Sequence, residues 1–172
     1  TADMDIEDLI QKEDMVVTVS NGGYIKRVPL SSYRTQKRGG KGKTGMTTKD
    51  EDFVHDMFVA NTHASVLCFS TAGIVYNIKV YKLPQGTPQS RGKALVNLLP
   101  LKLGETISTV MLMPEDESTW GDLDIVFATS KGTVRRNKLS DFVNIRQSGI
   151  IAMKIEEGEK LISVAFCDKS SE

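Results

Sequence analysis

Short apolar runs separated by polar turns dominate this chain, and one pattern of them occurs three times. In each copy an apolar run ends at Ser or Thr, a tight turn closes on a glycine, and a second strand-like run follows. The glycines are Gly23, Gly73 and Gly132, 50 and 59 residues apart, and glycine supplies the positive φ angle that such a turn requires. Alternating apolar and polar positions in VVTVS and IVFATS are typical of strands with one buried face. The pattern predicts three β-hairpins.

Each hairpin is accompanied by further strand-like runs, at 54–60, 107–113 and 161–167. The unit is therefore about four short strands over about fifty residues, which is typical of a radial array of four-stranded blades. We expect an all-β, propeller-like fold with blades near 14–60, 61–113 and 114–170, following an approach segment over 1–13. A helix is expected only at 6–12. Three blades alone leave two open ends, so we expect either a longer array or pairing with a second copy.

Composition narrows the class of protein. At 172 residues, with 40% apolar and 26% charged residues, the chain suits a soluble globular domain. It contains no apolar run of membrane-spanning length, and its acidic beginning does not resemble a secretory signal. Cys68 and Cys167 lie in apolar runs and are expected to be buried free thiols in a reducing cytosol. The acidic stretch 114–124 is expected to be a surface insertion that Trp120 anchors.

Charge is arranged in blocks along the chain. The 22 Lys and Arg balance the 22 Asp and Glu, which by itself argues against a nucleic-acid partner. Three windows, 24–49, 73–104 and 129–155, nevertheless hold 19 of the 22 basic residues and one acid, Asp141. Because these windows coincide with the repeats, folding can sort the two signs onto different surfaces, which matters more for binding than the net charge.

The most distinctive local motif is the glycine-rich cationic segment QKRGGKGK. Glycines let the backbone approach a phosphate strand closely, arginine can bind phosphate through two nitrogens, and lysines act as mobile point charges. The spacing excludes a phosphate loop of the G-x-x-x-x-G-K-S/T type. The alternative is a solvated basic loop without a partner. The candidate residues are Gln36, Lys37, Arg38, Gly39, Gly40, Lys41, Gly42 and Lys43.

The first seven of these residues, QKRGGKG, resemble the signature QRRGGKG of the bacterial gyrase A subunit, the GyrA box. The departure is Lys37 in place of arginine, which keeps the charge but loses a bidentate donor. The flanking SNGGYIKRVPLSSYRT is similar to the first blade of that family, and the resemblance extends through all three repeats. Because the related A-type subunit of topoisomerase IV has a degenerate or missing box, the motif favours gyrase.

The resemblance implies a β-pinwheel of six blades, of which this chain corresponds to about three, with a basic rim that bends duplex DNA. It implies a non-catalytic wrapping module of a type II topoisomerase, an isomerase that introduces negative supercoils using ATP. The implied partners are duplex DNA and, in a heterotetramer, the gyrase B subunit together with a second A subunit, in the cytoplasm on the chromosome and away from membranes. ATP and magnesium are used elsewhere in the holoenzyme, so no cofactor, metal ligand or catalytic residue is expected on this chain.

The repeats add further candidates for phosphate contact. Cations that follow the glycine turns recur at similar places, so we expect one folded edge to present them together with the loop cations. These candidates are Lys26, Arg27, Lys79, Lys82, Arg91, Lys93, Arg135, Arg136 and Arg146. Little in the sequence suggests base reading, so recognition by backbone and deformability is expected. Two alternatives stay open: the C-terminal domain of the A-type subunit of topoisomerase IV, and a propeller-like scaffold whose basic edge meets an acidic protein.

Overall fold

The computed structural model describes residues 7–33, 54–142 and 145–168. The chain divides into two compact units, one made of Thr1–Ser65 and Ile78–Leu99 and the other of Val66–Asn77 and Pro100–Glu172. The described residues form strands joined by turns and short helical segments, which confirms the all-β prediction. Of the segment 6–12, residues 7–9 are helical, and the expectation that a helix occurs only there is wrong, because residues 30–33 are also helical.

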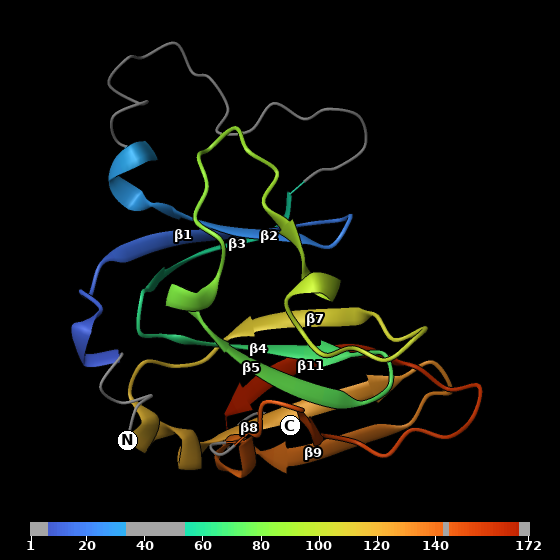
Figure 1. The fold of residues 1–172 in the computed structure, drawn as a ribbon. Helices are drawn as coiled ribbons and strands as arrows, with labels where there is room; N and C mark the ends of the chain where they lie inside the picture. The colour runs from blue at the N-terminus through green and yellow to red at the C-terminus, as the bar shows by residue number, and fades with distance from the viewer. Residues whose placement is uncertain (1–6, 34–53, 143–144, 169–172) are drawn as a thin grey trace. The chain divides into compact units, whose positions relative to one another are not determined.

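The first unit contains one four-stranded antiparallel sheet with the order β3-β1-β2-β6 (Figure 1). Its strands are β1 (Asp14–Ser20), β2 (Tyr24–Pro29), β3 (Val54–Asn61) and β6 (Lys93–Ala94). The strand β6 follows the second hairpin in sequence but pairs with β2 of the first, through Tyr24 opposite Ala94 and Ile25 opposite Lys93. The sheet therefore takes its edge strand from the next repeat.

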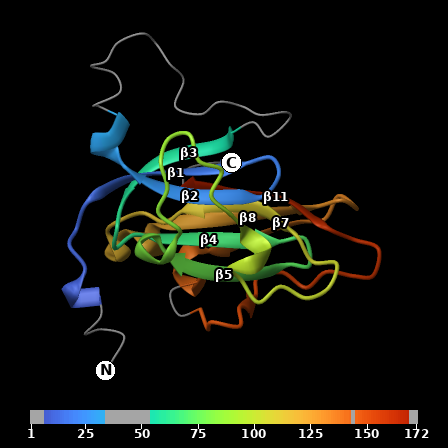
Figure 2. The ribbon, with the colours of Figure 1, turned by 45° about the horizontal axis from the view of Figure 1, so that its top comes forward.

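The second unit contains two sheets, seen as separate layers in Figures 1 and 2. The order of one is β10-β5-β4-β7, with β4 (Ser65–Ser70), β5 (Ile74–Lys79), β7 (Ile107–Leu112) and β10 (Ile150–Ile151); only Ser65 of β4 and the last two residues of β5 are assigned to the first unit. The order of the other is β11-β8-β9, with β8 (Leu123–Thr129), β9 (Val134–Lys138) and β11 (Leu161–Asp168). The strand β10 comes from the third repeat and covers β5, just as β6 covers β2. Among the described residues, no strand covers β9.

Short 3₁₀ segments connect these strands. They are η1 (Val80–Lys82), η2 (Leu95–Asn97), η3 (Glu117–Asp122) and η4 (Leu139–Phe142). Within the described residues, no helix is long and apolar enough to cross a membrane.

The three hairpin turns share one set of hydrogen bonds. In the first, Gly23 N–H donates to the Ser20 carbonyl at 3.0 Å, and Tyr24 N–H donates to Ser20 Oγ at 3.3 Å. The same two bonds link Ser70 with Gly73 and Ile74, and Thr129 with Gly132 and Thr133. The glycine φ angles are 84°, 81° and 83°. The hairpins predicted from the Ser/Thr-to-glycine pattern are thus confirmed in local geometry.

The core of the second unit lies between its two sheets. Phe69 from β4, Phe127 from β8 and Phe142 from η4 meet edge-to-face, with ring centroids 5.6 to 6.4 Å apart. All three are buried, and burial of each such side chain stabilises the fold by about 1.5–3 kcal/mol. In the first unit the fully buried Val17, Ile25 and Val28 serve the same purpose.

Trp120 and Cys68 bear out sequence expectations, whereas Cys167 does so only in part. Trp120 is 8% exposed, packs in the core of the second unit and donates from Nε1 to the Pro114 carbonyl at 3.0 Å. It therefore anchors the acidic segment, as expected. Both cysteines are free; Cys68 is buried, whereas Cys167 is only half-buried. Burial raises the pKa of the Cys68 thiol to about 12.

Candidate nucleic-acid interface

The glycine-rich cationic motif cannot be placed, because Gln36 to Lys43 lie outside the described residues. The expectation that this segment contacts DNA therefore stays a prediction. The cations on the repeats can be placed, and their environments differ sharply.

Aligning the repeats on their turn glycines gives a common register for the second strand of each hairpin. Lys26, Tyr76 and Arg135 occupy the third position after the glycine, and the fourth position is held by Arg27, Asn77 and Arg136. The cations of the first and third repeats therefore correspond. The second repeat has neutral side chains at both positions, and its candidates Lys79 and Lys82 lie further along the chain.

Lys26 lies on β2 and is only 1% exposed. Its ammonium donates three hydrogen bonds inside the first unit. The acceptors are the carbonyl oxygens of Thr87, Pro88 and Ser90, at 2.8, 3.0 and 2.6 Å from Nζ. Burial lowers the pKa of Lys26, while the three carbonyls satisfy all three of its donors. The expectation that Lys26 contacts a phosphate is corrected: this ammonium binds carbonyls of the loop over β2, residues 84–92.

Arg27 holds Leu83 and the first residues of the same loop, Pro84 to Gly86. Its Nε donates to the Leu83 carbonyl at 2.9 Å, and its Nη1 donates to Gln85 Oε1 at 3.2 Å. The backbone of Arg27 accepts from Gly86 and donates to the Pro84 carbonyl, both at 2.9 Å. Desolvation lowers the pKa of Arg27, and the charge of Glu13 opposes that shift. Most of this half-buried guanidinium is therefore used to hold the chain.

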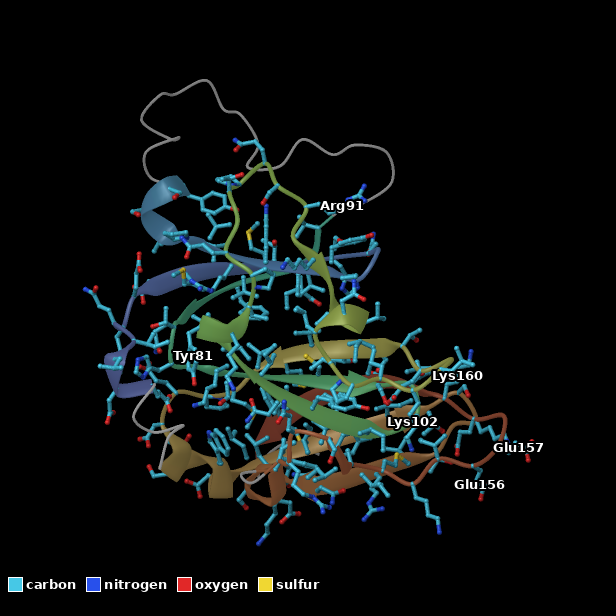
Figure 3. All side chains as sticks on the ribbon, viewed as in Figure 1. Tyr81, Arg91, Lys102, Glu156, Glu157 and Lys160 are labelled. Carbon is cyan, nitrogen blue, oxygen red and sulfur yellow. The ribbon has the colours of Figure 1, made fainter. Side chains whose placement is uncertain are left out.

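Arg91 and Lys93 follow the loop and are both exposed. The Arg91 guanidinium carbon lies 4.9 Å from the centroid of the Tyr24 ring, a cation–π geometry, and Figure 3 labels Arg91 among the side chains of the first unit. Between the two cations, Gly92 has a φ of 90° and passes so close to Ile25 that a Cβ would lie 2.4 Å from its carbonyl oxygen. Arg91 and Lys93 are thus both exposed, while the backbone between them packs tightly against β2.

Of the two candidates in the second repeat, Lys79 is bound by other residues of the chain and Lys82 is exposed. Lys79 Nζ lies 3.4 Å from Glu7 Oε1 and donates to the His63 carbonyl at 3.2 Å. His63 Nε2 in turn lies 2.7 Å from the Ile10 carbonyl, so Lys79 helps to attach the approach segment. Lys82 is exposed at the end of η1.

At the register of Lys26, the second repeat has Tyr76, which is 3% exposed. Its hydroxyl donates to the Glu105 carboxylate, 2.9 Å from Oε2, and Glu105 Oε1 also accepts from Lys102 N–H at 2.9 Å. Desolvation, followed by the bond to Glu105, raises the pKa of Tyr76 to about 12. A Cβ on Gly149 would lie 2.8 Å from the Tyr76 ring, so glycine is required beside this side chain as well.

The third repeat leaves its cations exposed. Arg135 and Arg136 both lie on the uncovered strand β9 and are exposed. Arg136 Nε lies 2.6 Å from Asp124 Oδ2, and Arg135 Nε donates to Asn137 Oδ1 at 3.1 Å. Arg146 is exposed, and its carbonyl accepts from Gly149 N–H at 2.8 Å. Arg135 and Arg136 are thus exposed on a strand that pairs only with β8 in the described residues, and each also contacts a neighbouring polar side chain.

The sequence interpretation missed a second recurring device, a Gly-Glu turn. Glu105 and Glu159 are 8% and 9% exposed, and each follows a glycine of positive φ. Each accepts the N–H three residues earlier and one hydroxyl; for Glu159 these are Glu156 N–H at 3.1 Å and Thr129 Oγ1 at 2.6 Å. The matching segments LGET and EGEK were the signal for it. Figure 3 places Lys102 and Lys160, two further exposed cations, on these turns.

The described residues carry several exposed cations. No group of three or more His, Cys, Asp or Glu side chains within the described ranges is arranged to hold a metal ion. The exposed guanidinium and ammonium groups suit phosphate oxygens, which they bind through charge-assisted hydrogen bonds. Of the nine candidates in the repeats, three are engaged in holding the chain and the rest are exposed; the three are Lys26, Arg27 and Lys79.

Antiparallel hairpin sheets that take their edge strands from the following repeat define a propeller-type repeat domain. A family model described as DNA gyrase C-terminal domain, beta-propeller, matches residues 14–61, 64–112 and 123–168. These segments make up most of the chain, so the chain belongs to the DNA gyrase C-terminal domain family.

Curated relatives agree with this family. The DNA gyrase A subunit of Rickettsia bellii (strain RML369-C) is 54% identical over 165 residues, which cover 96% of this chain and 18% of the relative. The DNA gyrase A subunit of Escherichia coli (strain K12) is 46% identical over 164 residues, covering 95% of this chain and 18% of the relative. The chain therefore spans less than a fifth of the length of these relatives.

Solved structures share the fold. The C-terminal domain of DNA topoisomerase IV is similar with a TM-score of 0.79 and 25% identity, covering 93% of this chain and 47% of that one. The C-terminal domain of DNA gyrase A gives a TM-score of 0.58 and 22% identity, covering 91% and 49%. The fold alone does not separate gyrase from topoisomerase IV, whereas the sequence identities favour the gyrase A subunit.

Proposed function

We propose that this chain is a non-catalytic module that binds and wraps duplex DNA within a gyrase-type topoisomerase. The observation that carries the proposal is the exposure of cations on the loops and strand edges of both units, in a chain that belongs to the gyrase C-terminal domain family. The proposed phosphate contacts in the described residues are Lys82, Arg91, Lys93, Arg135, Arg136 and Arg146. The motif residues Gln36 to Lys43 are proposed contacts on sequence grounds.

Wrapping requires phosphate attraction to offset the stiffness of DNA. Bending 20–30 base pairs by 40–90° costs on the order of 1–6 kcal/mol. Release of condensed counterions by several Lys and Arg side chains offsets this cost and does not depend on base sequence. The six proposed contacts outside the motif, each taking one phosphate, are of the number that such a balance needs. Weak sequence preference is therefore part of the proposal.

Within the holoenzyme, the proposed role is to present a neighbouring DNA segment for strand passage, so that ATP hydrolysis drives negative supercoiling. The gyrase B subunit and a second A subunit are the proposed protein partners, and the cytoplasmic chromosome is the proposed location. ATP and magnesium are assigned to other parts of the enzyme, and no cofactor is assigned to this chain. We assign the chain to gyrase rather than topoisomerase IV because its curated relatives at 46–54% identity are gyrase A subunits.

Duplex binding measured against salt tests the proposal. With about six phosphates contacted, affinity is expected to fall on the order of a thousandfold between 50 and 200 mM salt. An affinity that stays flat over this range would contradict the proposal and favour an acidic protein partner. Random and defined duplexes of equal length are expected to bind alike.

The cationic motif is tested in the full-length protein. Replacing Lys37, Arg38 and Lys41 together by alanine is expected to abolish negative supercoiling while DNA cleavage and relaxation continue. Normal supercoiling by this variant would show that the motif is a solvated loop without a partner.

A further inference from the structure

The loop over β2, residues 84–92, is built around a buried charge. Lys26 passes beneath it and donates to three of its carbonyls, a set we call the carbonyl cage (the backbone oxygens of Thr87, Pro88 and Ser90). A cation with nearly no exposure and three backbone acceptors is costly to desolvate and is found where it fixes a specific geometry. At the same register the second repeat has Tyr76, whose hydroxyl donates to the Glu105 carboxylate instead.

Polar contacts within the loop complete its shape. Ser90 Oγ accepts from Thr87 N–H at 3.0 Å and donates to the Thr87 carbonyl at 2.9 Å. Gly86 allows this closure, because a Cβ there would lie 2.4 Å from Ser90 Oγ. The loop therefore depends on hydrogen bonds to Lys26 and within itself.

Arg91 is joined directly to this cage. The carbonyl of Ser90, the residue before it, makes the shortest of the three bonds to Lys26, and Gly92, the residue after it, is pressed against Ile25. The backbone on both sides of Arg91 is thus fixed to β2. Its guanidinium rests over Tyr24 on the same strand and is exposed.

We infer that Lys26 is a positioning residue for DNA binding: its carbonyl cage holds the loop so that Arg91 is presented to a phosphate. The inference rests on the proposed function and extends it, since Lys26 contributes to affinity without touching DNA. Prior ordering of the loop matters because binding otherwise has to immobilise both the loop and the long arginine side chain.

A double-mutant cycle tests this inference. Duplex affinity and its salt dependence are measured for the 172-residue chain, Lys26→Met, Arg91→Ala and the double variant. Lys26→Met and Arg91→Ala are each expected to weaken binding about tenfold and to lower the log–log salt slope by about 0.9, the value for one phosphate. The double variant is expected to bind no more weakly than either single variant, because both remove the same contact.

Two control variants distinguish a positioning role of Lys26 from a general loss of positive charge and from a loss of folding. Lys12→Met removes one exposed cation outside the loop and is expected to leave affinity within about twofold. Ser90→Ala loosens the loop but leaves Lys26 and the fold intact; it is expected to weaken binding by a few-fold, and only when Arg91 is present. This second variant keeps the test decisive if Lys26→Met fails to fold.

The outcomes separate the two proposals. Salt-independent binding by the unsubstituted chain overturns the proposed function. Salt-dependent binding with additive losses from Lys26→Met and Arg91→Ala, or from Ser90→Ala and Arg91→Ala, overturns only the positioning role. A normal affinity and slope for Arg91→Ala overturns the contact that Lys26 is inferred to position.

Discussion

The first and second repeats fill the same backbone register with different chemistry. Three residues after the turn glycine, the first has Lys26, which donates to a carbonyl cage, and the second has Tyr76, which donates to a buried carboxylate. Both side chains are nearly inaccessible, at 1% and 3% exposure. In both repeats a two-residue strand pairs with the hairpin edge, and the glycine before that strand packs against this register.

The third repeat shows what removes a cation from the surface. One position before the register, Ile25 and Val75 are fully buried, whereas Val134 is 66% exposed. The described residues place no strand over β9, and Arg135 is accordingly exposed. In the described residues, the register lies buried where a strand from the following repeat pairs with the hairpin edge, and exposed where none does. The cation's sequence position alone does not decide this.

The largest effect expected from this comparison concerns the glycine that packs against the edge. Gly92→Ala places a Cβ 2.4 Å from the Ile25 carbonyl at a φ of 90°, so we expect a loss of about 4 kcal/mol in the free energy of unfolding from overlap and left-handed strain. Gly23→Ala is the matched control. Its φ is 84° but nothing lies within 4 Å, and a loss of about 1 kcal/mol is expected. Equal losses in denaturant unfolding would refute the edge-packing explanation.

The second-largest change in the free energy of unfolding is expected for the side chain three residues after the turn glycine. Lys26→Met leaves three inward carbonyls without their donor and is expected to lower the free energy of unfolding by about 3 kcal/mol. Arg135→Met, at the same register on the uncovered strand, is expected to change it by no more than about 0.5 kcal/mol. Urea titration of the two variants measures the difference. If Arg135→Met is as damaging as Lys26→Met, the register matters independently of edge coverage.

Tyr76→Phe probes the alternative chemistry of the second repeat. Loss of the hydroxyl removes one hydrogen bond to Glu105, and we expect about 1.5 kcal/mol of destabilisation at neutral pH. The folded pKa of Tyr76 is raised from 10.0 to about 12. The stability from this shift is present below pH 10 and is lost as the pH rises from 10 to 12. Tyr76→Phe should therefore converge on the unsubstituted chain over that range; a constant gap would contradict the assignment.

Much of the fold could be predicted from the sequence because its signals are local. The Ser/Thr-to-glycine spacing encodes the turn hydrogen bonds directly, and strand alternation follows from burial of one face. Edge-strand exchange is non-local: Lys93 and Ala94 carry no mark that they pair with Ile25 and Tyr24. The burial of Lys26 depends on that exchange, which the sequence does not reveal. Lys26 was therefore predicted to lie on the surface and to contact a phosphate. The Gly-Glu turns were visible as repeated letters, but their hydroxyl partners were not.

The smallest effect is expected at Glu159, the buried carboxylate on the turn that precedes β11. The pKa of Glu159 is lowered, first by the hydroxyl of Thr129 and then by the N–H of Glu156. A carboxylate with a lowered folded pKa contributes stability above its ordinary pKa of 4.5, and this stability is lost as the pH falls through the folded value. Glu159→Gln should therefore flatten the acid limb of the stability–pH curve below about pH 5.

Glu157→Gln provides the control for this measurement, because Glu157 lies on the same turn but is exposed. It is expected to leave the acid limb unchanged. The dependence of stability on acid can then be compared between Glu159 in the third repeat and Lys26 in the first. A buried carboxylate that accepts donors gives stability that acid removes, whereas the cage around Lys26 consists of carbonyls that do not titrate. If Lys26→Met altered the acid limb as strongly as Glu159→Gln, the stabilisation by Lys26 would depend on a carboxylate, and its assignment to the carbonyl cage would fail.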